Sequence, residues 1–455
     1  MTDIDIKEVP LAPKNPLPFW QRVKAAKRFD TGPEALRDAG GPVTRNVLGP
    51  NWLMPPLVFV TSPQGAREIL GRTDDLAERG ATPMSRELRR LSGDNLLVVA
   101  HADWLPRRRA LQPIFTKQRV PTFAGHMAEG AEQLSQQWRG RAEIDLDTAC
   151  RVLTLRALGR SVLGVEMGEK ADVVGDALRS AVSWAAARAF RPVNSPHWLP
   201  TRGQRRARAA ILALRELAAQ ILHQCRADPG ADAPLVRALM DATDPRTGEG
   251  LSDRAICDEL MLFLMAGHDT TSTSLAYTLW ALGRRPELQR RLAAEVRALG
   301  ERRLLPEDVP RLGFTVQVLH EGLRMCPPAP AVGRMVLRDI VIDDVRVEAG
   351  SFVVVGIYAL HHDPSLWDDP HTFDPDRFSP QRGKDRDRWQ YLPFGGGPHG
   401  CIGGHFALLE ASLALATIIR AVEITSLDDE FPTATPLTTV AAAPIRARVR
   451  ARTQS

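Results

Sequence analysis

Hydrophobic and polar positions along the chain repeat with two periods, and the helical period of about 3.6 residues predominates. Two short strand-like runs, Val43 to Leu48 and Leu57 to Val60, are separated by a proline-containing turn and predict a hairpin near the start. Ser62-Pro63 then supplies a capping residue and a first-turn proline for a helix, and helical periodicity continues to about Leu222. We expect the first half of the chain to be mainly α-helical.

The second half combines a long apolar helix with a second small sheet. Ala255 to Leu282 is long enough to cross a bilayer, but the acids and the histidine inside it predict a buried helix of a soluble protein. Apolar residues recur with a period of two, as in strands, from Ile340 to Val347 and from Phe352 to Gly356, with Gly350 at the turn. The tail from Ile445 to Arg452 alternates arginine with apolar residues, as a half-exposed strand does.

Helices are also expected near Pro286 to Leu299 and near Val316 to Met325. The segment from Asp244 to Gly250 is a polar loop that is typical of a surface connection rather than of a domain linker. We therefore expect one domain over residues 1–455, mainly α with small β regions, with a short flexible segment over about residues 1–18.

The composition is that of an ordinary globular protein. Of 455 residues, 44% are hydrophobic and 25% are charged, which indicates a substantial core. The formal charge of +5 is modest and the arginines are spread over the chain, so we expect no nucleic-acid partner and favour an acidic protein partner. Met1 to Pro18 lacks the apolar core of a signal peptide or membrane anchor, which predicts a cytoplasmic protein.

The cysteines are scattered, odd in number and never in a C-x-x-C pair (Cys150, Cys225, Cys257, Cys326 and Cys401). This pattern argues against a disulfide framework and against a structural zinc site. It leaves room for one cysteine to act alone, as a metal ligand or as a nucleophile.

The strongest chemical signal lies around Cys401. The segment from Phe394 to Gly403 reads FGGGPHGCIG, and it stands between an aperiodic loop and a helix predicted over Gly403 to Val422. Glycine lets the backbone approach a large flat ligand, and amides at a helix N-terminus favour a thiolate over a thiol. On these residues alone, a tight glycine-rich turn with an incidental buried cysteine is an equally good interpretation.

The same segment resembles the haem-binding signature of the cytochrome P-450 family, with Phe394, Cys401 and Gly403 at the family's spacing. The resemblance implies that Cys401 is the axial ligand of the iron of haem b, and it implies the mainly α cytochrome P-450 fold with small β regions. His399 stands where most members have arginine. Its contact with a haem propionate is therefore expected to be weaker and pH-dependent.

A second motif, AGHDTT, interrupts the long apolar helix at Ala266 to Thr271. Small residues and threonines can open a helix locally, and an acid beside an alcohol supplies a proton path in a dry pocket. The alternative is a helix kink with a salt-bridged acid and threonines that cap carbonyls. Because the run resembles the family's oxygen-binding motif, it implies a proton relay at Asp269, a hydrogen-bonding alcohol at Thr270, and an oxygen-bordering pair, Ala266 and Gly267. We expect His268 to turn away from the haem.

Glu321 and Arg324 are three residues apart on one predicted helix, a spacing that in isolation is a surface pair worth ~0.2 to 0.5 kcal/mol. With Arg377 downstream, the pair resembles the family's Glu-x-x-Arg motif and meander arginine. The resemblance implies a buried triad of these three residues that fixes the loop before Cys401.

Haem carries two propionates, which need basic or hydrogen-bonding partners. The resemblance implies that these partners include Trp104, Arg108, His101, Arg334 and His399. The neighbours of Arg108, namely Arg107 and Arg109, are expected on a solvated face, and with Lys117 and Arg119 they are candidates for a docking patch for an acidic electron carrier.

The implied activity is a monooxygenase reaction in which one oxygen atom of O2 enters a lipophilic small molecule, by default as a hydroxyl group. A ferredoxin or flavodoxin and its reductase are expected to supply the electrons, so that NAD(P)H acts only indirectly, and the protein is expected to be a monomer. A fatty acid, terpenoid, steroid or polyketide is the expected substrate class, and a biosynthetic role in secondary metabolism and a role in xenobiotic breakdown are equally open. By motif alignment the pocket includes Leu262, Met265, Ala266, Ala329, Ala331 and Val332, beside a variable segment from Thr82 to Val99.

Three other functions remain open at this point. A peroxide-driven peroxygenase would be expected to lack the pair Asp269 and Thr270, and a non-enzymatic haem sensor or carrier would need no proton relay. A hydrolase using Cys401 and His399 is disfavoured because the two are only two positions apart and lack an acid to orient them.

Overall fold

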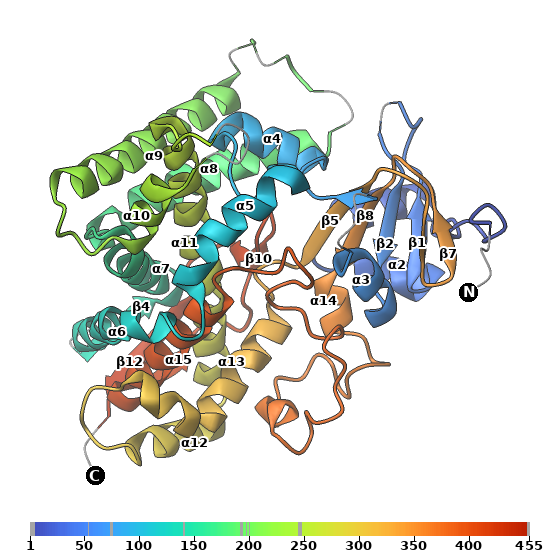
Figure 1. The fold of residues 1–455 in the computed structure, drawn as a ribbon. Helices are drawn as coiled ribbons and strands as arrows, with labels where there is room; N and C mark the ends of the chain where they lie inside the picture. The colour runs from blue at the N-terminus through green and yellow to red at the C-terminus, as the bar shows by residue number, and fades with distance from the viewer. Residues whose placement is uncertain are drawn as a thin grey trace.

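The molecule divides into a helix-rich part and a smaller part built on a mixed sheet, which lie side by side in Figure 1. The chain begins at the sheet and ends beside the helix-rich part, near α12 (Pro286–Arg297). The computed structural model describes residues 5–52, 54–72, 76–139, 142–191, 194–196, 198–199, 201–243 and 248–452.

Helices account for most of the regular structure. In chain order they are α1 (Phe19–Ala26), α2 (Gly32–Gly40), α3 (Pro63–Leu70), α4 (Pro83–Ser92), α5 (His101–Leu111), α6 (Ala124–Arg139), α7 (Leu146–Leu158), α8 (Ala171–Ala189), α9 (Arg202–Ala227), α10 (Pro234–Asp241), α11 (Asp253–Gly283), α12, α13 (Gly313–Met325), α14 (Ile357–His361) and α15 (Gly404–Ala421). The strands are β1 (Val43–Asn46), β2 (Leu57–Val60), β3 (Ala77–Glu78), β4 (Glu143–Asp145), β5 (Ala331–Val336), β6 (Ile340–Ile342), β7 (Val345–Val347), β8 (Phe352–Gly356), β9 (Val422–Ser426), β10 (Thr433–Ala434), β11 (Val440–Ala441) and β12 (Arg446–Ala451).

The largest sheet joins strands from both halves of the chain. Its order is β1-β2-β8-β5-β3, in which β2 pairs antiparallel with β1 and parallel with β8. The pairing of Val43 with Val60 confirms the predicted hairpin. The side chain of Ser62 accepts a hydrogen bond from the backbone N–H of Gly65, so that α3 begins at Pro63 as predicted.

The period-two run from Ile340 to Val347 folds as two strands, β6 and β7, with Ile342 opposite Val345. Asp343 and Asp344 make the turn, with φ angles of 50° and 61°. These are the left-handed values that a tight two-residue hairpin loop requires. The turn could not be recognised in the sequence because it lacks the glycine that usually marks such a loop.

The N-terminal segment is attached more firmly than the sequence suggests. Leu11 forms a bridge with Arg346, and Lys14 forms one with Arg45. The expectation of a flexible segment over residues 1–18 is therefore wrong for this part, because its partners lie far along the chain where a local pattern cannot reveal them. Residues 1–4 lie outside the described part of the chain.

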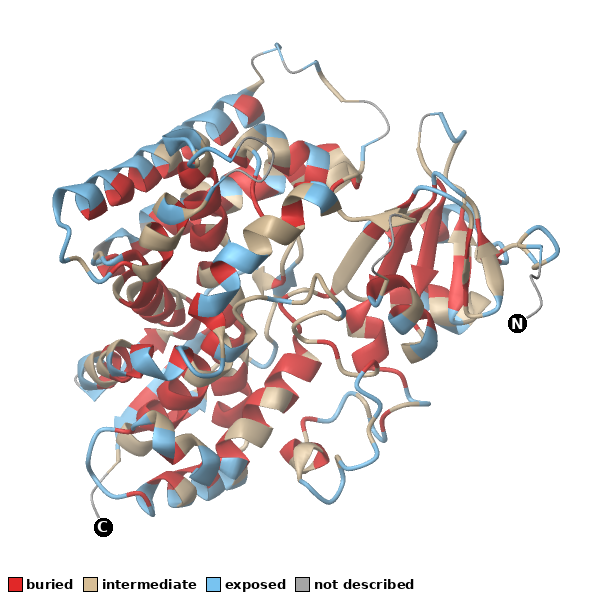
Figure 2. Ribbon diagram, in the orientation of Figure 1, coloured by how far each residue is buried: buried red, intermediate tan, exposed pale blue. Residues whose placement is uncertain are grey.

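The longest helix, α11, runs through the helix-rich part, and α7, α9, α13 and α15 pack against it. Figure 2 shows that α7, α11, α13 and α15 are largely buried, whereas α9 is exposed along much of its length. The side chain of Ser252 accepts a hydrogen bond from the N–H of Ala255, which begins the helix where the sequence placed a cap. The long apolar run is therefore a core helix, as predicted.

α13 begins at Gly313, earlier than the periodicity indicated. The backbone N–H groups of Phe314 and Thr315 donate to the carboxylate of Glu295 at 2.6 and 2.9 Å. Glu295 belongs to α12, so this cap comes from a neighbouring helix rather than from the local sequence. Of the predicted loop from Asp244 to Gly250, residues 244–247 lie outside the described part.

The C-terminal tail forms β12, which pairs with β4 and β9. Ala447 and Val449 are buried, and the alternating arginines Arg446, Arg448 and Arg450 are exposed, as the pattern predicted. Among the described residues, α15 has the length and composition that a membrane span needs, and most of it is buried inside the protein, as core helices also are.

Candidate active site

Glycines shape the loop before α15. Gly395 and Gly397 have φ angles of 70° and 68°, in the left-handed region that favours glycine. A Cβ atom on Gly397 would lie 1.9 Å from the carbonyl oxygen of Leu70. The backbone N–H of Cys401 donates to the carbonyl oxygen of Phe394 at 2.8 Å and closes the loop. The glycine-rich turn therefore holds one cysteine at the start of a helix, as predicted.

Cys401 is exposed, whereas the other four cysteines are buried, and all five are free thiols, as expected. Burial by surrounding protein nevertheless raises the pKa of the Cys401 thiol, against the opposing effects of the Gly403 amide and Arg108. Cys401 is thus accessible although protein atoms surround it closely, which indicates that it borders an internal hollow. The Gly403 amide favours the thiolate, as expected, but burial has the larger effect on the pKa of Cys401. A metal cation bound to the sulfur would stabilise the thiolate, since a coordinating thiol is deprotonated.

Partly or fully buried arginines gather beside this loop. Arg108, on α5, donates from Nη1 to the carbonyl oxygen of Gly400 at 3.0 Å. Arg334, on β5, is buried, and burial lowers its pKa to about 10. Burial together with Arg334 and Arg108 lowers the pKa of Arg79 to about 9. Arg79 was not predicted, because nothing in its local sequence marks it.

Within the part of the chain that the structure describes, no carboxylate lies within ion-pair distance of Arg79, Arg108 or Arg334. A buried charge without a partner costs several kcal/mol. A ligand with two carboxylates would remove that cost. The cluster therefore fits the two propionates of haem.

Two histidines and a tryptophan complete the cluster. Nδ1 of His101 lies 3.3 Å from Nε2 of His399, and the ring of Trp104 lies 3.9 Å from the ring of His399. Burial, Arg79 and Arg334 hold the pKa of His399 far below its usual range, and its Nδ1 has no partner among the described residues. The structure thus brings together the sequence-predicted propionate partners.

Arg107, next to Arg108, is not on a solvated face as predicted. Its Nη1 lies 2.8 Å from Oε1 of Glu259, a buried residue of α11. The two are far apart in sequence, so the pairing could not be predicted from the arginine run. Arg109 is exposed, as expected.

The motif on α11 combines a carbonyl cap with an isolated acid. Oγ1 of Thr270 donates to the carbonyl oxygen of Ala266 at 2.7 Å. Asp269 is buried, and burial raises its pKa to about 6, although Arg151 on α7 opposes the effect. Ala266 is exposed while most of α11 is buried, so it too borders an internal hollow.

Gly267 and His268 face neighbouring helices. A Cβ atom on Gly267 would lie 2.9 Å from a methyl group of Leu158, so a larger residue here would displace the Leu158 side chain of α7. His268 is fully buried, and its Nε2 lies 2.9 Å from the position of a Cβ atom on Gly175 of α8. The histidine thus points to α8.

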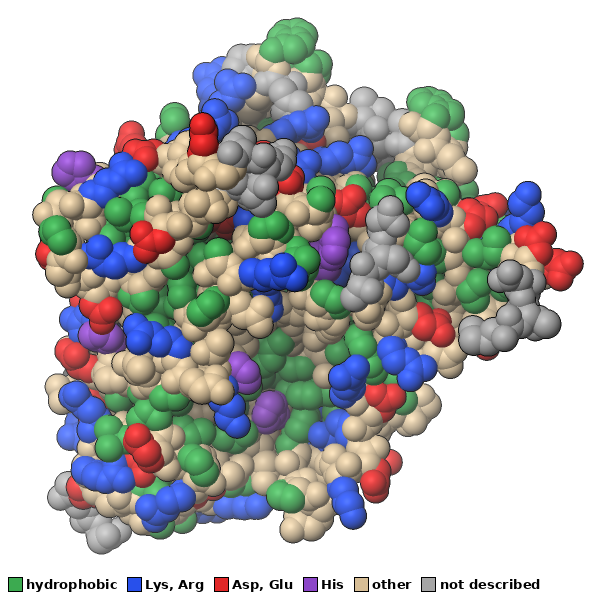
Figure 3. Space-filling view, viewed as in Figure 1, with side chains coloured by type: hydrophobic (Ala, Val, Ile, Leu, Met, Phe, Trp, Pro, Cys, Tyr) green, Lys and Arg blue, Asp and Glu red, His purple; other side chains and the backbone are tan. Residues whose placement is uncertain are grey.

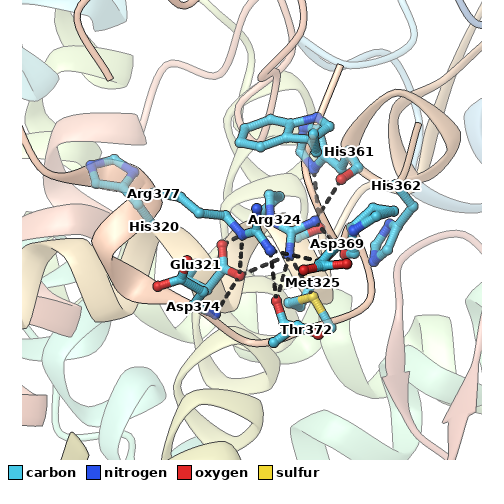
Figure 4. A network of polar contacts seen from close by, with 12 residues as sticks. His320, Glu321, Arg324, Met325, His361, His362, Asp369, Thr372, Asp374 and Arg377 are labelled. Carbon is cyan, nitrogen blue, oxygen red and sulfur yellow. Dashed lines mark hydrogen bonds and ion pairs between the residues drawn. The ribbon is translucent and has the colours of Figure 1, made fainter. Parts of the chain in front are cut away.

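Figure 4 shows the buried ion network formed by Glu321, Arg324 and Arg377. Arg324 donates to both carboxylate oxygens of Glu321 at 2.7 and 2.8 Å, and Nε of Arg377 lies 3.5 Å from Oε1. Nη1 of Arg324 donates to the carbonyl oxygen of His361, and the Nε2 of His361 accepts from the N–H of Leu392 at 2.9 Å. His361, which the sequence did not reveal, therefore links the network to the loop before Cys401.

Comparison with known proteins decides the family. A sequence profile described as Cytochrome P450 matches residues 11–449. The chain belongs to the cytochrome P450 family. It is 35% identical over 339 residues to cyclooctatin synthase of Streptomyces melanosporofaciens, which covers 74% of each chain. It is 32% identical to cyclooctat-9-en-7-ol 5-monooxygenase of the same organism over 72% of each chain.

A solved P450 agrees with this result. The haem domain of a cytochrome P450DA mutant superposes with a TM-score of 0.81 and 27% identity, over 98% of each chain. The resemblance and the mainly α fold predicted from the sequence are therefore confirmed. The protein is a haem-dependent oxidoreductase of the monooxygenase class, and the interpretation of Cys401 as the nucleophile of a hydrolase is wrong.

The predicted pocket residues of this P450 differ in exposure: Leu262 is buried, and Met265, Ala329, Ala331 and Val332 are partly buried. The variable segment from Thr82 to Val99 contributes to an apolar cluster that also contains Ala185 and Leu437. The N–H of Thr439 donates to the carbonyl oxygen of Pro328 at 2.8 Å and ties the chain after Leu437 to the pocket segment. Ala185 and Leu437 lie far from the motifs, which is why the sequence did not identify them.

The surface of this P450 is hollowed between α13 and α14 on the face drawn in Figure 3. Hydrophobic side chains line the hollow, and Lys and Arg side chains stand around its rim.

Proposed function

We propose that this P450 hydroxylates a lipophilic small molecule of the terpenoid type, with haem b held by Cys401. The arginines beside the Cys401 loop that lack an acid partner carry this proposal, because two carboxylates on one flat ligand would pair with them. Bound haem supplies the oxidising power that inserts one oxygen atom of O2 into a C–H bond, with two electrons from outside the chain.

Each group of residues has a distinct role in this proposal. Arg79, Arg108 and Arg334 hold the propionates, and His101, Trp104 and His399 support them. Phe394 and Gly403 shape the thiolate loop, and the N–H of Gly403 donates to the sulfur of Cys401 and tunes it. Glu321, Arg324 and Arg377 keep the loop in place through His361. The chain acts as one haem domain.

Asp269 and Thr270 hold and deliver protons. A pKa near 6 lets the Asp269 carboxyl both carry and release a proton close to neutral pH. Thr270, whose hydroxyl is bonded to the exposed Ala266, presents a hydrogen-bonding group at the hollow, where Ala266 and the backbone of Gly267 leave room for oxygen. This acid and alcohol pair favours a monooxygenase over a peroxygenase and over a haem sensor.

The apolar lining of the pocket supports a lipophilic substrate. Its members are Leu262, Met265, Ala266, Ala329, Ala331 and Val332, and none carries a charge. Among the classes expected from the sequence, a terpenoid is favoured because the relative named above oxidises cyclooctat-9-en-7-ol, a cyclic alkenol by its name. A role in secondary metabolism follows from the same similarity.

The electrons come from a ferredoxin or flavodoxin and its reductase, which draw on NAD(P)H. The exposed side chains Arg109, Lys117 and Arg119 offer a basic surface to such an acidic carrier. The protein works as a cytoplasmic monomer in this proposal.

Turnover with labelled dioxygen tests the proposal. The purified holoprotein is combined with a ferredoxin, its reductase and NADPH, and with a panel of cyclic terpenoid alcohols, fatty acids and steroids. We expect one heavy oxygen atom in a product from the terpenoid alcohols. Reducing equivalents consumed without an oxygenated product from any class, or product formed only with added peroxide, would contradict it.

A further inference from the structure

The segment between α4 and α5 is attached to α11 by two neighbouring acids. The N–H of Leu96 donates to Oε2 of Glu259 at 3.0 Å, and the backbone of Asp94 forms a hydrogen bond with the carboxylate of Asp258. Asp258 and Glu259 are both buried residues of α11. Hydrogen bonds from backbone N–H groups to carboxylates are strong because the acceptor is charged. They fix residues 94–96 against the helix.

Arg107, on α5, adds a third connection. Its Nη1 lies 2.8 Å from Oε1 of Glu259 and also donates to the carbonyl oxygen of Asp94 at 2.8 Å. Burial raises the pKa of Glu259, and the N–H of Leu96 and the charge of Arg107 oppose that effect. The two donors thus favour the ionised carboxylate, which is the stronger acceptor for the N–H of Leu96.

The carbonyl group of Leu96 in turn holds Arg79. Nη2 of Arg79 donates to this carbonyl oxygen at 2.6 Å, whereas Nε of Arg79 is buried without a partner among the described residues. The charge of Arg79 acts on His399, which places Arg79 in the cluster beside the Cys401 loop. Because a guanidinium is rigid and planar, fixing one nitrogen restricts where the other two can point. The backbone of Leu96 therefore helps to set the orientation of Arg79.

We propose that Glu259 is a positioning residue for haem: through the backbone of Leu96 it holds the guanidinium of Arg79 in the orientation that meets a propionate. The inference rests on the proposed role of Arg79 as a propionate partner. An arginine side chain loses conformational entropy when a ligand orders it, and an arginine that is already held loses less. Removing the carboxylate of Glu259 should therefore weaken haem binding through Arg79.

A role of Glu259 in folding alone predicts a different dependence on Arg79. If Glu259 only fixes the segment between α4 and α5, its removal weakens haem binding to the same extent with or without Arg79. If Glu259 acts through Arg79, its removal has no further effect once the guanidinium is gone. Effects of independent residues add, and those of coupled residues do not. A double-mutant cycle with Arg79→Leu, which can bind neither a propionate nor a carbonyl group, separates the two roles.

The variants at Glu259 separate the hydrogen-bond acceptor from the charge. Glu259→Leu removes both, and Glu259→Gln keeps an oxygen for the N–H of Leu96. Asp253→Asn is the matched control, because it removes an acid of the same helix whose ion pair with Arg226 is exposed. If Glu259→Leu does not fold, Glu259→Leu combined with Arg107→Met takes its place, since the combination leaves no arginine without its acid.

The first measurement is the rate at which each holoprotein loses haem to an excess of apomyoglobin. We expect Glu259→Leu to lose haem several-fold faster than the wild type, Glu259→Gln to restore most of the retention, and Asp253→Asn to match the wild type. In the Arg79→Leu background, Glu259→Leu should cause no further acceleration. A wild-type rate in Glu259→Leu, or the same acceleration in both backgrounds, would overturn the inference.

The second measurement uses the haem-free protein. Amide hydrogen exchange of peptides that cover residues 93–99 should be several-fold faster in Glu259→Leu than in the wild type, and unchanged in Asp253→Asn. Unchanged exchange in Glu259→Leu would overturn the inference, because it would show that the carboxylate does not hold this segment. A wild type that takes up no haem, or an Arg79→Leu variant that retains haem as the wild type does, would instead refute the proposed function and the inference with it.

Discussion

Two groups of buried arginines differ in whether the chain supplies an acid for them. Arg324 and Arg377 meet the carboxylate of Glu321 inside the core. Arg334 is buried and Arg79 is half-buried, but no carboxylate of the described residues lies within ion-pair distance of them. Since an unpaired buried charge is unfavourable, the first group is complete without a ligand and the second is completed by one. The contrast separates the residues that hold the fold from those that hold haem.

The largest expected effect comes from breaking the complete group. Glu321→Gln leaves two buried arginines without their acid and should lower the free energy of unfolding by about 3 to 5 kcal/mol. Denaturant titration of the holoprotein measures it. The control is Asp253→Asn, which breaks an exposed ion pair with Arg226 and should change stability little. Equal effects of the two variants would show that the buried network is not structural.

Asp269 extends the comparison to an acid that lacks an adequate partner. Burial raises its folded-state pKa from 3.8 to about 6, despite Arg151 and with Asp147 and His268 nearby. The protonated Asp269 carboxyl therefore contributes fully to the free energy of unfolding below about pH 4, and this contribution is lost as the pH rises through about 6. Asp269→Asn has no ionisable group at this position, so its stability should not fall over this pH range. At pH 7 its free energy of unfolding should be roughly 2 to 3 kcal/mol above that of the wild type. The free energy of unfolding of both proteins, measured from pH 4 to 8, tests this. The same pH dependence in the wild type and in Asp269→Asn would contradict it.

The incomplete group should respond in opposite directions with and without haem. In the haem-free protein, Arg79→Gln removes a half-buried charge that lacks an acid partner and should raise the free energy of unfolding by about 1 to 3 kcal/mol. In the holoprotein, the same change should weaken haem retention, which competition for haem by an excess of apomyoglobin measures. A loss of stability in both forms would mean that Arg79 has an acid partner after all.

Exposed arginines form a third group, for which the smallest effect on stability is expected. Arg109→Glu should leave the unfolding curve and the haem spectrum unchanged. It should slow electron transfer from the redox partner, and the difference from the wild type should shrink as salt is added. Stopped-flow reduction at two salt concentrations checks this. An unchanged rate at low salt would place the partner elsewhere.

The sequence predicted what local spacing encodes. The loop before Cys401, the motif on α11 and the pairing of Glu321 with Arg324 all depend on residues a few positions apart, and the structure places them together. Arg79, His361 and the capping of α13 by Glu295 could not be predicted, because each acts on a residue distant in sequence. The pairing of Arg107 with Glu259 escaped prediction for the same reason.

The spectrum of the reduced holoprotein with carbon monoxide, beside that of Cys401→Ala, tests the central claim most directly. We expect the strongly red-shifted Soret band of a thiolate-ligated haem in the wild type and its loss in Cys401→Ala. A histidine-type band in the wild type, or the same red-shifted band in Cys401→Ala, would contradict the assignment of Cys401 as the haem ligand.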